Sequence, residues 1–363
     1  WLQSTYHGYV ASRLQLCDPR DAGRLLPRAL DGEFVLAPVA DDRAAQLIDA
    51  AVPVTEPDAA VIVTTSGSTG DPKQVVLSAS AIRASASAFR QRYGAFSWTC
   101  VLGAQHVAGL MVQARDLLDR PYADGRTAIS IVPTQLVRAL REPSSAAELA
   151  AYDAVLVGGA AIRPALLDQA EAAGIAVLTS YGMSETCGGV AFDGSPLPGA
   201  DIAIGDDGRI DIGGPMLFSG YRLDPEATAK VLVNGRLLTN DRGQWVIDDD
   251  GQRQLRVLGR IDDVIISGGV NVDLARLQRV LDARIDRPAV VVGVPDPEWG
   301  TRVVVATTSD EAVIGQWRDE LRPYLEPAAL PRQLLVVEAF PRTDSGKLDR
   351  RRLAEWAARP GRS

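Results

Sequence analysis

The segment with the clearest potential for chemistry in this chain is Thr64–Lys73 (TTSGSTGDPK). Its glycines let backbone N–H groups turn toward an anion, its hydroxyl side chains add donors, and Lys73 adds a full positive charge. The segment is not a Walker loop, because Asp71 and Pro72 separate Gly70 from the lysine. It predicts a phosphate-binding loop formed by Thr64, Thr65, Ser66, Gly67, Ser68, Thr69, Gly70 and Lys73.

Taken alone, a turn rich in serine, threonine and glycine is more often a flexible connection than a binding site. The flanks of this turn favour a site. The apolar, β-branched run Ala59–Thr64 precedes it, and the apolar segment Gln74–Leu77 follows it. The expected order is therefore a buried strand, a polar loop and a second strand.

Five further segments combine glycines with polar or charged side chains, and they follow the loop in the order Gly158–Ile162 (GGAAI), Ser180–Gly188 (SYGMSETCG), Leu238–Gly243 (LTNDRG), Gly259–Gly269 (GRIDDVIISGG) and Pro341–Arg350 (PRTDSGKLDR). Together with the loop they resemble the motifs of the acyl-adenylate-forming superfamily. This superfamily includes acyl-CoA synthetases, the adenylation domains of peptide synthetases, and luciferases. The resemblance spans about Thr64 to Lys347.

The resemblance implies an ATP site. Gly158, Gly159 and Ala160 would lie along the adenine, Tyr181 would stack on it next to Gly182, and Ser184, with Thr186 beside it, would meet the α-phosphate. Glu185 would hold Mg²⁺, which suits a hard cation that bridges phosphates. Asp241 would accept the ribose hydroxyls, although many relatives have glycine where this chain has Asn240, and Arg260 would contact ribose and phosphate.

The resemblance also implies a moving C-terminal domain. Asp262 falls at the hinge position, and Ser267, Gly268 and Gly269 border the path of coenzyme A. Lys347 matches the mobile catalytic lysine, which offsets charge as the carboxylate attacks phosphorus. By itself, a lysine in a surface turn is usually inert. With Lys347 at the reacting centre, Lys73 would bind the departing pyrophosphate.

Among members of the superfamily, the chain looks most like the o-succinylbenzoate–CoA ligases of menaquinone biosynthesis. The features are VPTQL at residues 132–136, GGAAI together with NDRG, and the few residues that precede the phosphate loop. The acid pocket would then include His106, Arg115 and Thr134. Arg115 would bind the carboxylate that is not activated. Its alternative is a surface or ion-paired residue, and it shares a face with His106 only if the helix starts after Gly109.

The elements that must position these residues predict an α/β fold. Strand-like runs (59–64, 74–77, 128–132, 154–157, 175–179 and 202–204) alternate with helical stretches (78–93, 133–140, 145–150 and 163–173), as in a largely parallel sheet. Residues 1–58 predict short helices and turns, and the chain from about Gly199 predicts a β-rich subdomain. Residues 273–337 predict a compact α+β pattern. We expect an N-terminal domain over residues 1–260, shortened at its start, and a small mobile domain over residues 261–363.

Composition narrows the function classes. The 46% of apolar and 23% of charged residues are typical of a soluble globular protein, and the net charge of −8 argues against a nucleic-acid partner. The three cysteines lie far apart and predict neither a disulfide framework nor a zinc site. No apolar run is long enough to enter a membrane, so we expect a cytoplasmic enzyme with small-molecule substrates. Assembly into a homodimer stays open.

We therefore expect an acid–CoA ligase that uses ATP, Mg²⁺ and coenzyme A. The nearest rivals are another aryl- or fatty-acyl-CoA ligase and a stand-alone adenylation enzyme that loads a carrier protein. A rival from another class is an inactive nucleotide-binding module that acts through partners.

Overall fold

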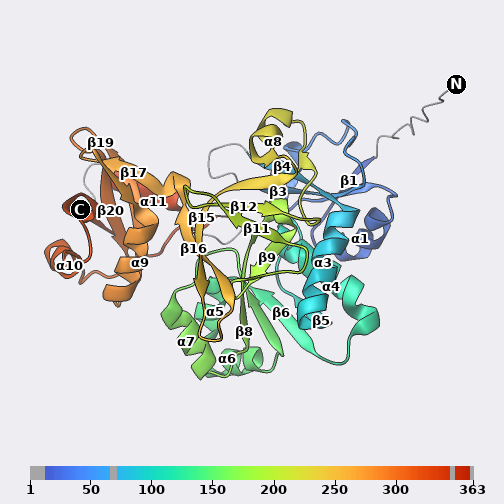
Figure 1. Cartoon of the computed structure of the whole chain (residues 1–363), viewed down its shortest axis with the longest axis horizontal. Coiled ribbons are helices and arrows are strands. Elements are labelled where there is room, and N and C mark those ends of the chain that lie inside the picture. Colours follow the sequence, from blue (N-terminus) through green and yellow to red (C-terminus); the bar gives the residue numbers. More distant parts are fainter. Residues whose placement is uncertain (1–12, 66–71, 344–347, 360–363) are drawn as a thin grey trace. The chain divides into compact units, whose positions relative to one another are not determined.

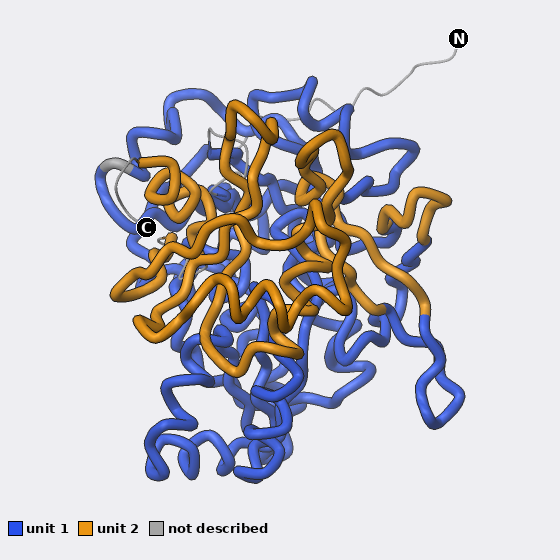
Figure 2. Tube along the Cα trace, turned by 90° about the vertical axis from the view of Figure 1, so that its left-hand side faces the viewer, with its two compact units in different colours: residues 1–203, 211–239, 246–255 blue, residues 204–210, 240–245, 256–363 orange. Residues whose placement is uncertain are grey.

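The computed structural model describes residues 13–65, 72–343 and 348–359 (Figure 1). The chain forms two compact units (Figure 2). Unit 1 comprises residues 1–203, 211–239 and 246–255, and unit 2 comprises residues 204–210, 240–245 and 256–363. The predicted boundary after residue 260 stays a prediction. Among the helices of the described ranges, none has the length and apolarity that crossing a membrane requires.

The first sheet of unit 1 carries the strands on either side of the predicted phosphate loop. Its order is β1 (Leu14–Cys17), β2 (Val35–Pro38), β3 (Ala59–Thr65), β4 (Lys73–Ser78) and β13 (Gly220–Tyr221). Its helices are α1 (Ala22–Leu30), α2 (Asp42–Gln46) and α3 (Ala79–Tyr93). Ser78 ends β4 and caps α3 by accepting a hydrogen bond from the backbone of Ala81.

The prediction of only helices and turns before residue 58 was wrong. β1 and β2 form a parallel pair, and β2 continues the sheet to β3. All four residues of β2 are buried. A run of four apolar residues has no period that distinguishes a buried strand from part of a helix, and the pairing partners that decide the matter are distant in sequence.

The second sheet of unit 1 contains three of the runs predicted for a largely parallel sheet, 128–132, 154–157 and 175–179. The runs 59–64 and 74–77 instead pair antiparallel in the first sheet, and 202–204 lies in a third sheet. The order of the second sheet is β10 (Ser195–Pro196), β9 (Gly188–Phe192), β8 (Val177–Met183), β7 (Ala154–Val157), β6 (Thr127–Ile131) and β5 (Ser97–Cys100). β5 to β8 are mutually parallel, and β9 turns back antiparallel to β8. Its helical segments are α4 (Val107–Asp119), η1 (Arg120–Tyr122), α5 (Pro133–Ala139), α6 (Pro143–Ala150), α7 (Pro164–Ala172) and η2 (Ser184–Thr186).

The alternation of side chains along these strands forms a separate core on each face of the sheet. Ala128 and Leu156 pack with residues of α3, α4 and β9. Ile129 and Val155, one residue along each strand, pack with residues of α5, α6 and α7. The sheet is therefore covered on both faces, as a parallel sheet requires.

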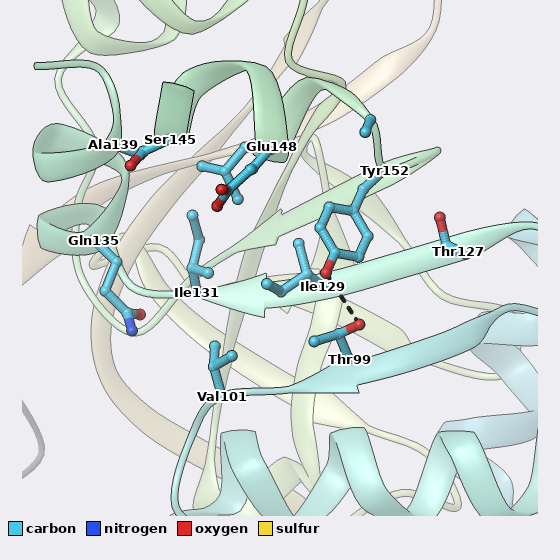
Figure 3. Close-up of a pocket in the computed structure, with 12 residues that line it drawn as sticks. Thr99, Val101, Thr127, Ile129, Ile131, Gln135, Ala139, Ser145, Glu148 and Tyr152 are labelled. Atoms are coloured by element: carbon cyan, nitrogen blue, oxygen red, sulfur yellow. Dashed lines mark hydrogen bonds between the residues drawn. The ribbon is translucent and has the colours of Figure 1, made fainter. Parts of the chain in front are cut away.

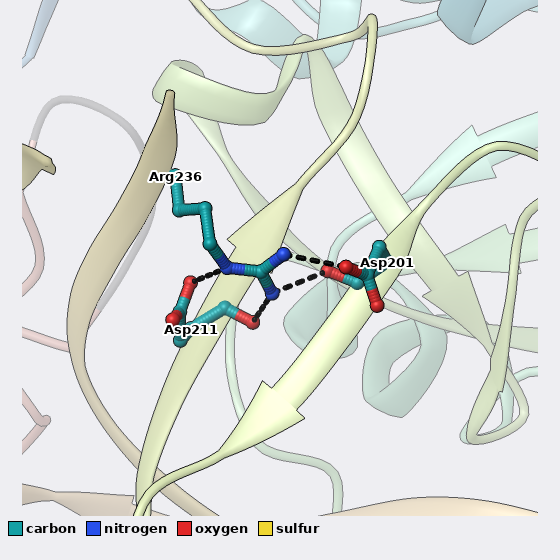
Figure 4. A network of polar contacts seen from close by, with 3 residues as sticks. All are labelled: Asp201, Asp211 and Arg236. Carbon is teal, nitrogen blue, oxygen red and sulfur yellow. Dashed lines mark hydrogen bonds and ion pairs between the residues drawn. The ribbon is translucent and has the colours of Figure 1, made fainter. Parts of the chain in front are cut away.

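A third sheet confirms the predicted β-rich region after Gly199, although β15 (Arg236–Ile247) and β16 (Arg253–Arg260) are longer than the short strands expected there. Its order is β11 (Asp201–Ile204), β12 (Arg209–Gly213), β15 and β14 (Leu232–Val233), with β16 beside β15 and α8 (Pro225–Val231) before β14. Within unit 1, Arg236 binds the carboxylates of Asp201 and Asp211 (Figure 4). This arginine thereby ties β11 and β12 to β15.

Unit 2 is the predicted α+β module. Its sheet has the order β18 (Val270–Asp273), β17 (Val264–Ser267), β20 (Gly300–Thr307) and β19 (Ala289–Asp296), with β21 (Gln333–Val336) parallel to β20. Its helical segments are η3 (Ile261–Asp263), α9 (Leu274–Arg284), α10 (Ile314–Leu321), η4 (Pro327–Ala329) and α11 (Arg350–Ala358). Residues of α9 and α10 cover one face of the sheet, and residues of α11 cover the other.

Candidate active site

Segments from four parallel strands meet at one edge of the second sheet. Gly158 directly follows β7, and Tyr181 lies near the end of β8. Thr134 is the second residue of α5, the helix that follows β6. His106 lies in the connection that leaves β5. Because the carboxyl ends of parallel strands share an edge, the topology gathers four of the predicted segments there, which is where α/β sheets bind ligands.

Gly158 permits a close approach between two of these segments. A Cβ atom at this position would collide with the hydroxyl of Ser180 on β8. Its backbone N–H donates to the carbonyl of Ile131 at the end of β6, which fixes the start of the turn. Gly159 and Ala160 follow it and are exposed. The first residue of the predicted adenine-binding turn is therefore fixed by a hydrogen bond, and the two residues after it are exposed to solvent.

The segment after β8 forms the tight turn η2. Ser184 and Glu185 are half-buried, whereas Thr186 is fully buried. The hydroxyl of Thr186 lies 2.6 Å from the carbonyl of Gly188 and accepts from the backbone N–H of Met183. In this conformation the hydroxyl of Thr186 shapes the turn, and its predicted place beside the nucleotide stays a prediction.

Glu185 and Lys73 are both in contact with a residue that the sequence did not single out, Tyr221. The Tyr221 hydroxyl donates to Oε1 of Glu185 over 2.7 Å. Nζ of Lys73 lies 4.4 Å from the centre of the Tyr221 ring. A tyrosine in the string FSGYR carries no local signal of such a contact, because 36 residues separate it from Glu185.

The two strands around the predicted phosphate loop are in register. Thr64 pairs with Gln74 and Thr65 pairs with Lys73, so Thr65 and Lys73 face each other where β3 ends and β4 begins. Ser66, Gly67, Ser68, Thr69 and Gly70 lie outside the described residues, as does Lys347. The predicted roles of these six residues stay predictions.

Three predicted residues come together in unit 2. Arg260 forms a two-pronged ion pair with Asp262, with both N–O distances at 2.7 Å, and its Nη1 lies 3.8 Å from Oδ1 of Asp241. The hydrogen bonds with Asp262 are the main reason that the pKa of Arg260 is raised, and those with Arg260 lower the pKa of Asp262. The side chains of Arg260 and Asp262 are more than a third exposed.

The predicted path of coenzyme A is a hairpin turn. Ser267 ends β17 and pairs with Val270 on β18, which leaves Gly268 and Gly269 as a two-residue turn. Both glycines have positive φ, +58° and +80°, as a type I′ turn requires. A side chain at Gly268 would also meet the ring of Trp299. The glycines therefore have a structural reason to be there, whether or not coenzyme A passes over them.

The predicted acid-binding residues do not share one surface. α4 begins at Val107, with His106 as its N-cap, so the helix starts before Gly109. Nine residues of helix place Arg115 about half a turn away from His106. The structure thereby decides a point that the sequence left open: helix geometry does not place His106 and Arg115 on one face of α4. Thr134 is half-buried at the start of α5.

Arg115 lies in the aromatic core between α3, α4 and the second sheet. It is 2% exposed, and its guanidinium carbon lies 4.6 Å from the centre of the Phe89 ring, with Trp98 and Phe192 within 6 Å. Its Nε and Nη2 have no hydrogen-bond partner among the described residues. Burial lowers the pKa of Arg115 to about 10, and the charge of Asp119 opposes this shift. Arg115 is therefore a buried cation with donors to spare.

A pocket of about 690 Å³ lies on the opposite face of the second sheet, between the strands β5 and β6 and the helices α5 and α6 (Figure 3). Val101, Ile129, Ile131 and Leu149 line it, and Gln135 points into it from α5. None of His106, Arg115 and Thr134 lines it. The gathering of predicted residues at the strand ends is a better guide to the site, because this pocket contains no cationic side chain for an anionic substrate.

The fit of Glu185 to a metal ion rests on donor chemistry. The described residues contain no group of three or more histidine, cysteine or acidic side chains that together could hold a metal. Mg²⁺ bound with a nucleotide usually takes one or two carboxylates and leaves the remaining positions to phosphate and water. A single half-buried carboxylate, bonded to a tyrosine that also contacts Lys73, fits that mode.

Comparison with known proteins gives the family. The sequence matches the model described as AMP-binding enzyme over residues 17–118 and 122–224. It also matches the model described as AMP-binding enzyme C-terminal domain over residues 287–347.

Two relatives illustrate the sequence similarity. A protein of Mycobacterium tuberculosis named "Probable 2-succinylbenzoate--CoA ligase" is 38% identical over 321 residues, which cover 81% of this chain and 83% of that protein. The 2-succinylbenzoate–CoA ligase of Enterococcus faecalis is 32% identical over 337 residues, which cover 81% of this chain and 68% of that protein.

Two solved structures illustrate the similarity of fold. Escherichia coli MenE with a bound analogue of OSB-AMS aligns with a TM-score of 0.73 at 23% identity, covering 96% of this chain and 89% of that chain. Bacillus subtilis o-succinylbenzoate CoA synthetase, in complex with the acyl-adenylate OSB-AMP, aligns with a TM-score of 0.68 at 24% identity. That alignment covers 94% of this chain and 78% of the other.

Proposed function

The chain belongs to the AMP-binding enzyme family, and from that premise we propose that it is the o-succinylbenzoate–CoA ligase of menaquinone biosynthesis. The observation that carries the proposal is the 38% identity to the M. tuberculosis protein, over 83% of the length of that protein. The E. faecalis relative, with the same named activity, supports it independently.

The proposed reaction has two steps. A carboxylate oxygen of the acid attacks the α-phosphorus of ATP, and the bond from that phosphorus to pyrophosphate breaks, which gives acyl-AMP. The sulfur of coenzyme A then attacks the acyl carbon, the bond to AMP breaks, and the thiol loses its proton. The products are the CoA thioester, AMP and pyrophosphate.

On the phosphate side, Lys73 binds the departing pyrophosphate and the loop residues donate to its oxygens. Glu185 supplies a carboxylate oxygen for Mg²⁺, which when bound with ATP offsets the charge of the phosphates. The Lys73–Tyr221–Glu185 contacts support this assignment, because they hold a cation and a carboxylate close together in unit 1. Ser184 and Tyr181 meet the α-phosphate and the adenine.

On the hinge side, Asp241 binds the ribose hydroxyls and Arg260 contacts ribose and phosphate. Asp262 is the residue about which the C-terminal domain rotates between the two steps, and Lys347 approaches the reacting carboxylate in the first. The support is the grouping of Asp241, Arg260 and Asp262 within one unit.

For the acid, Arg115 binds the carboxylate that is not activated. Its support is the burial of a guanidinium whose Nε and Nη2 have no acceptor among the described residues. Leaving buried donors unsatisfied is costly, and a substrate carboxylate would satisfy them with charge-assisted hydrogen bonds. His106 and Thr134 contact the acid from the ends of β5 and β6, on a different side from Arg115, because His106 and Arg115 lie about half a turn apart on α4.

The proposal is tested with a panel of acids assayed for AMP formation with and without coenzyme A. We expect o-succinylbenzoate to be the best substrate and AMP release to depend on coenzyme A. AMP formation with another aryl or fatty acid as the best substrate identifies a different acyl-CoA ligase. Pyrophosphate exchange without thioester identifies a stand-alone adenylation enzyme, and nucleotide binding without either reaction identifies an inactive module. Because ATP and coenzyme A are cytoplasmic metabolites, we place the reaction in the cytoplasm.

A further inference from the structure

The short segment Phe218–Arg222 contacts both Glu185 and Lys73, the residues proposed to bind Mg²⁺ and the phosphates. The backbone N–H of Phe218 donates to the carbonyl of Glu185, and the Tyr221 hydroxyl donates to the carboxylate of the same residue. The face of the Tyr221 ring meets Nζ of Lys73. One phenol therefore contacts the residue proposed for the metal ion and the residue proposed for the phosphates.

Tyr221 has little freedom to move. Its side chain is 7% exposed, and the ring of Phe218 packs edge-on against it with centres 5.0 Å apart. β13 pairs with β4 so that Tyr221 lies opposite Val75, and its backbone N–H donates to Oγ1 of Thr228 over 2.8 Å. The ring is thus held against the strand that begins with Lys73.

The neighbouring Arg222 anchors the segment further. It is 4% exposed, and its guanidinium donates to the side chain of Gln74 and to the carbonyls of Asp49 and Val52. The backbone N–H of Arg222 donates to the carbonyl of Gln74. Gln74 follows Lys73 in the chain, so the anchor and the lysine belong to the same strand.

The hydroxyl of Tyr221 is a permanent donor. A phenol is a donor near neutral pH and an ionised carboxylate can only accept, so the 2.7 Å contact runs from the Tyr221 hydroxyl to Oε1 of Glu185. The proton therefore stays on the tyrosine at that pH and is available to the Glu185 carboxylate. The hydrogen bond from Tyr221 thereby orients Oε1 of the Glu185 carboxylate.

We propose that Tyr221 is a positioning residue that fixes the Glu185 carboxylate and the Lys73 ammonium relative to each other, so that Mg²⁺ and the phosphates of ATP bind cooperatively. The inference rests on the proposed function, because it takes Lys73 and Glu185 as the phosphate and metal residues. A purely structural tyrosine would affect stability but not the coupling between the two ligands.

The test measures the affinity of the full chain for ATP by calorimetry, with Mg²⁺ and with EDTA. Tyr221→Phe keeps the ring under Lys73 and removes only the donor to Glu185. Its affinity for ATP in EDTA should stay within about twofold of wild type. The gain in affinity that Mg²⁺ gives should fall about tenfold, as for one hydrogen bond to a charged group. Tyr221→Leu also removes the ring and should weaken ATP binding in EDTA by about fivefold.

Tyr152→Phe is the matched control, because it removes a phenol that is also hydrogen-bonded in unit 1, to Oγ1 of Thr99 over 3.1 Å. It should leave both affinities unchanged. If Tyr221→Phe, folded by its thermal transition, keeps the full gain from Mg²⁺, the inference is overturned while the proposed function stands. If wild type itself binds no ATP, the proposed function fails and the inference fails with it. Should Tyr221→Leu not fold, the phenylalanine variant decides.

Discussion

Two groups of proposed site residues differ in how the protein holds them. In unit 1, Glu185 and Lys73 contact a buried tyrosine that several backbone hydrogen bonds fix in place. In unit 2, Arg260 and Asp262 hold each other as a pair that is more than a third exposed. Exposed ion pairs are screened by salt, and their side chains exchange partners readily. A buried polar group that loses its partner leaves a hydrogen-bonding group unsatisfied, which is costly. The first arrangement suits a fixed binding surface and the second suits a hinge.

The largest effect expected from this division concerns Lys347. Lys347→Ala should lower acid-dependent pyrophosphate exchange by about 10² to 10³, the range for removal of one transition-state donor. The same variant should still convert pre-made acyl-AMP and coenzyme A to thioester, because this step does not need charge offset at phosphorus. Surviving pyrophosphate exchange would mean that Lys347 is not the mobile lysine.

The anchor of the fixed group should dominate stability. Arg222→Met leaves three partly buried acceptors without their donor, and we expect the free energy of unfolding to fall by about 2 kcal/mol in a urea titration. Arg24→Met is the control, because the ion pair of Arg24 with Asp21 is long, at 3.5 Å, and both side chains are more than half exposed. Equal losses in the two variants would contradict the view that Arg222 anchors the segment.

Arg115 is buried like Tyr221, but its Nε and Nη2 have no hydrogen-bond partner among the described residues. Arg115→Met should raise the KM for o-succinylbenzoate about tenfold or more and leave monoacids no worse. The free energy of unfolding should stay within about 1 kcal/mol of wild type, because a well-packed apolar side chain can replace a buried charge without loss. A loss of stability with equal effects on diacids and monoacids would make Arg115 a structural residue.

The smallest effect is expected at the hinge. Asp262→Asn should lower the free energy of unfolding by less than about 1 kcal/mol at low salt, as for other exposed pairs. Because Arg260 lowers the pKa of Asp262 in the folded state, this contribution is present above the unfolded pKa of about 4. It is lost as pH falls through the lower folded pKa. Thermal unfolding from pH 3 to 7 measures it, and a difference that grows toward acid would contradict the sign.

Much of the fold was within reach of the sequence because its signals are local. The apolar runs at β3 and β7 and the helical stretch at α3 were predicted near their observed bounds, since each has a local hydrophobic pattern and clear flanking residues. β1 and β2 were not, because four-residue strands are defined by their pairing partners. The start of α4 at Val107 was left open, and the structure decides it.

The candidate site divides in the same way. The motif residues Lys73, Glu185, Asp241 and Arg260 are visible because residue type and order carry the resemblance. Tyr221 is not, because its contacts depend on β13 pairing with β4 across more than a hundred residues of sequence. The burial of Thr186 and the aromatic surroundings of Arg115 likewise come from packing, which a single sequence does not display.

The most direct test of the account is the specificity of the purified chain for its acid. With ATP, Mg²⁺ and coenzyme A, the kcat/KM for o-succinylbenzoate should exceed that for benzoate and for octanoate by at least about a hundredfold, with one AMP released for each thioester. An equal or higher value for either monoacid, or AMP release without thioester, would contradict it.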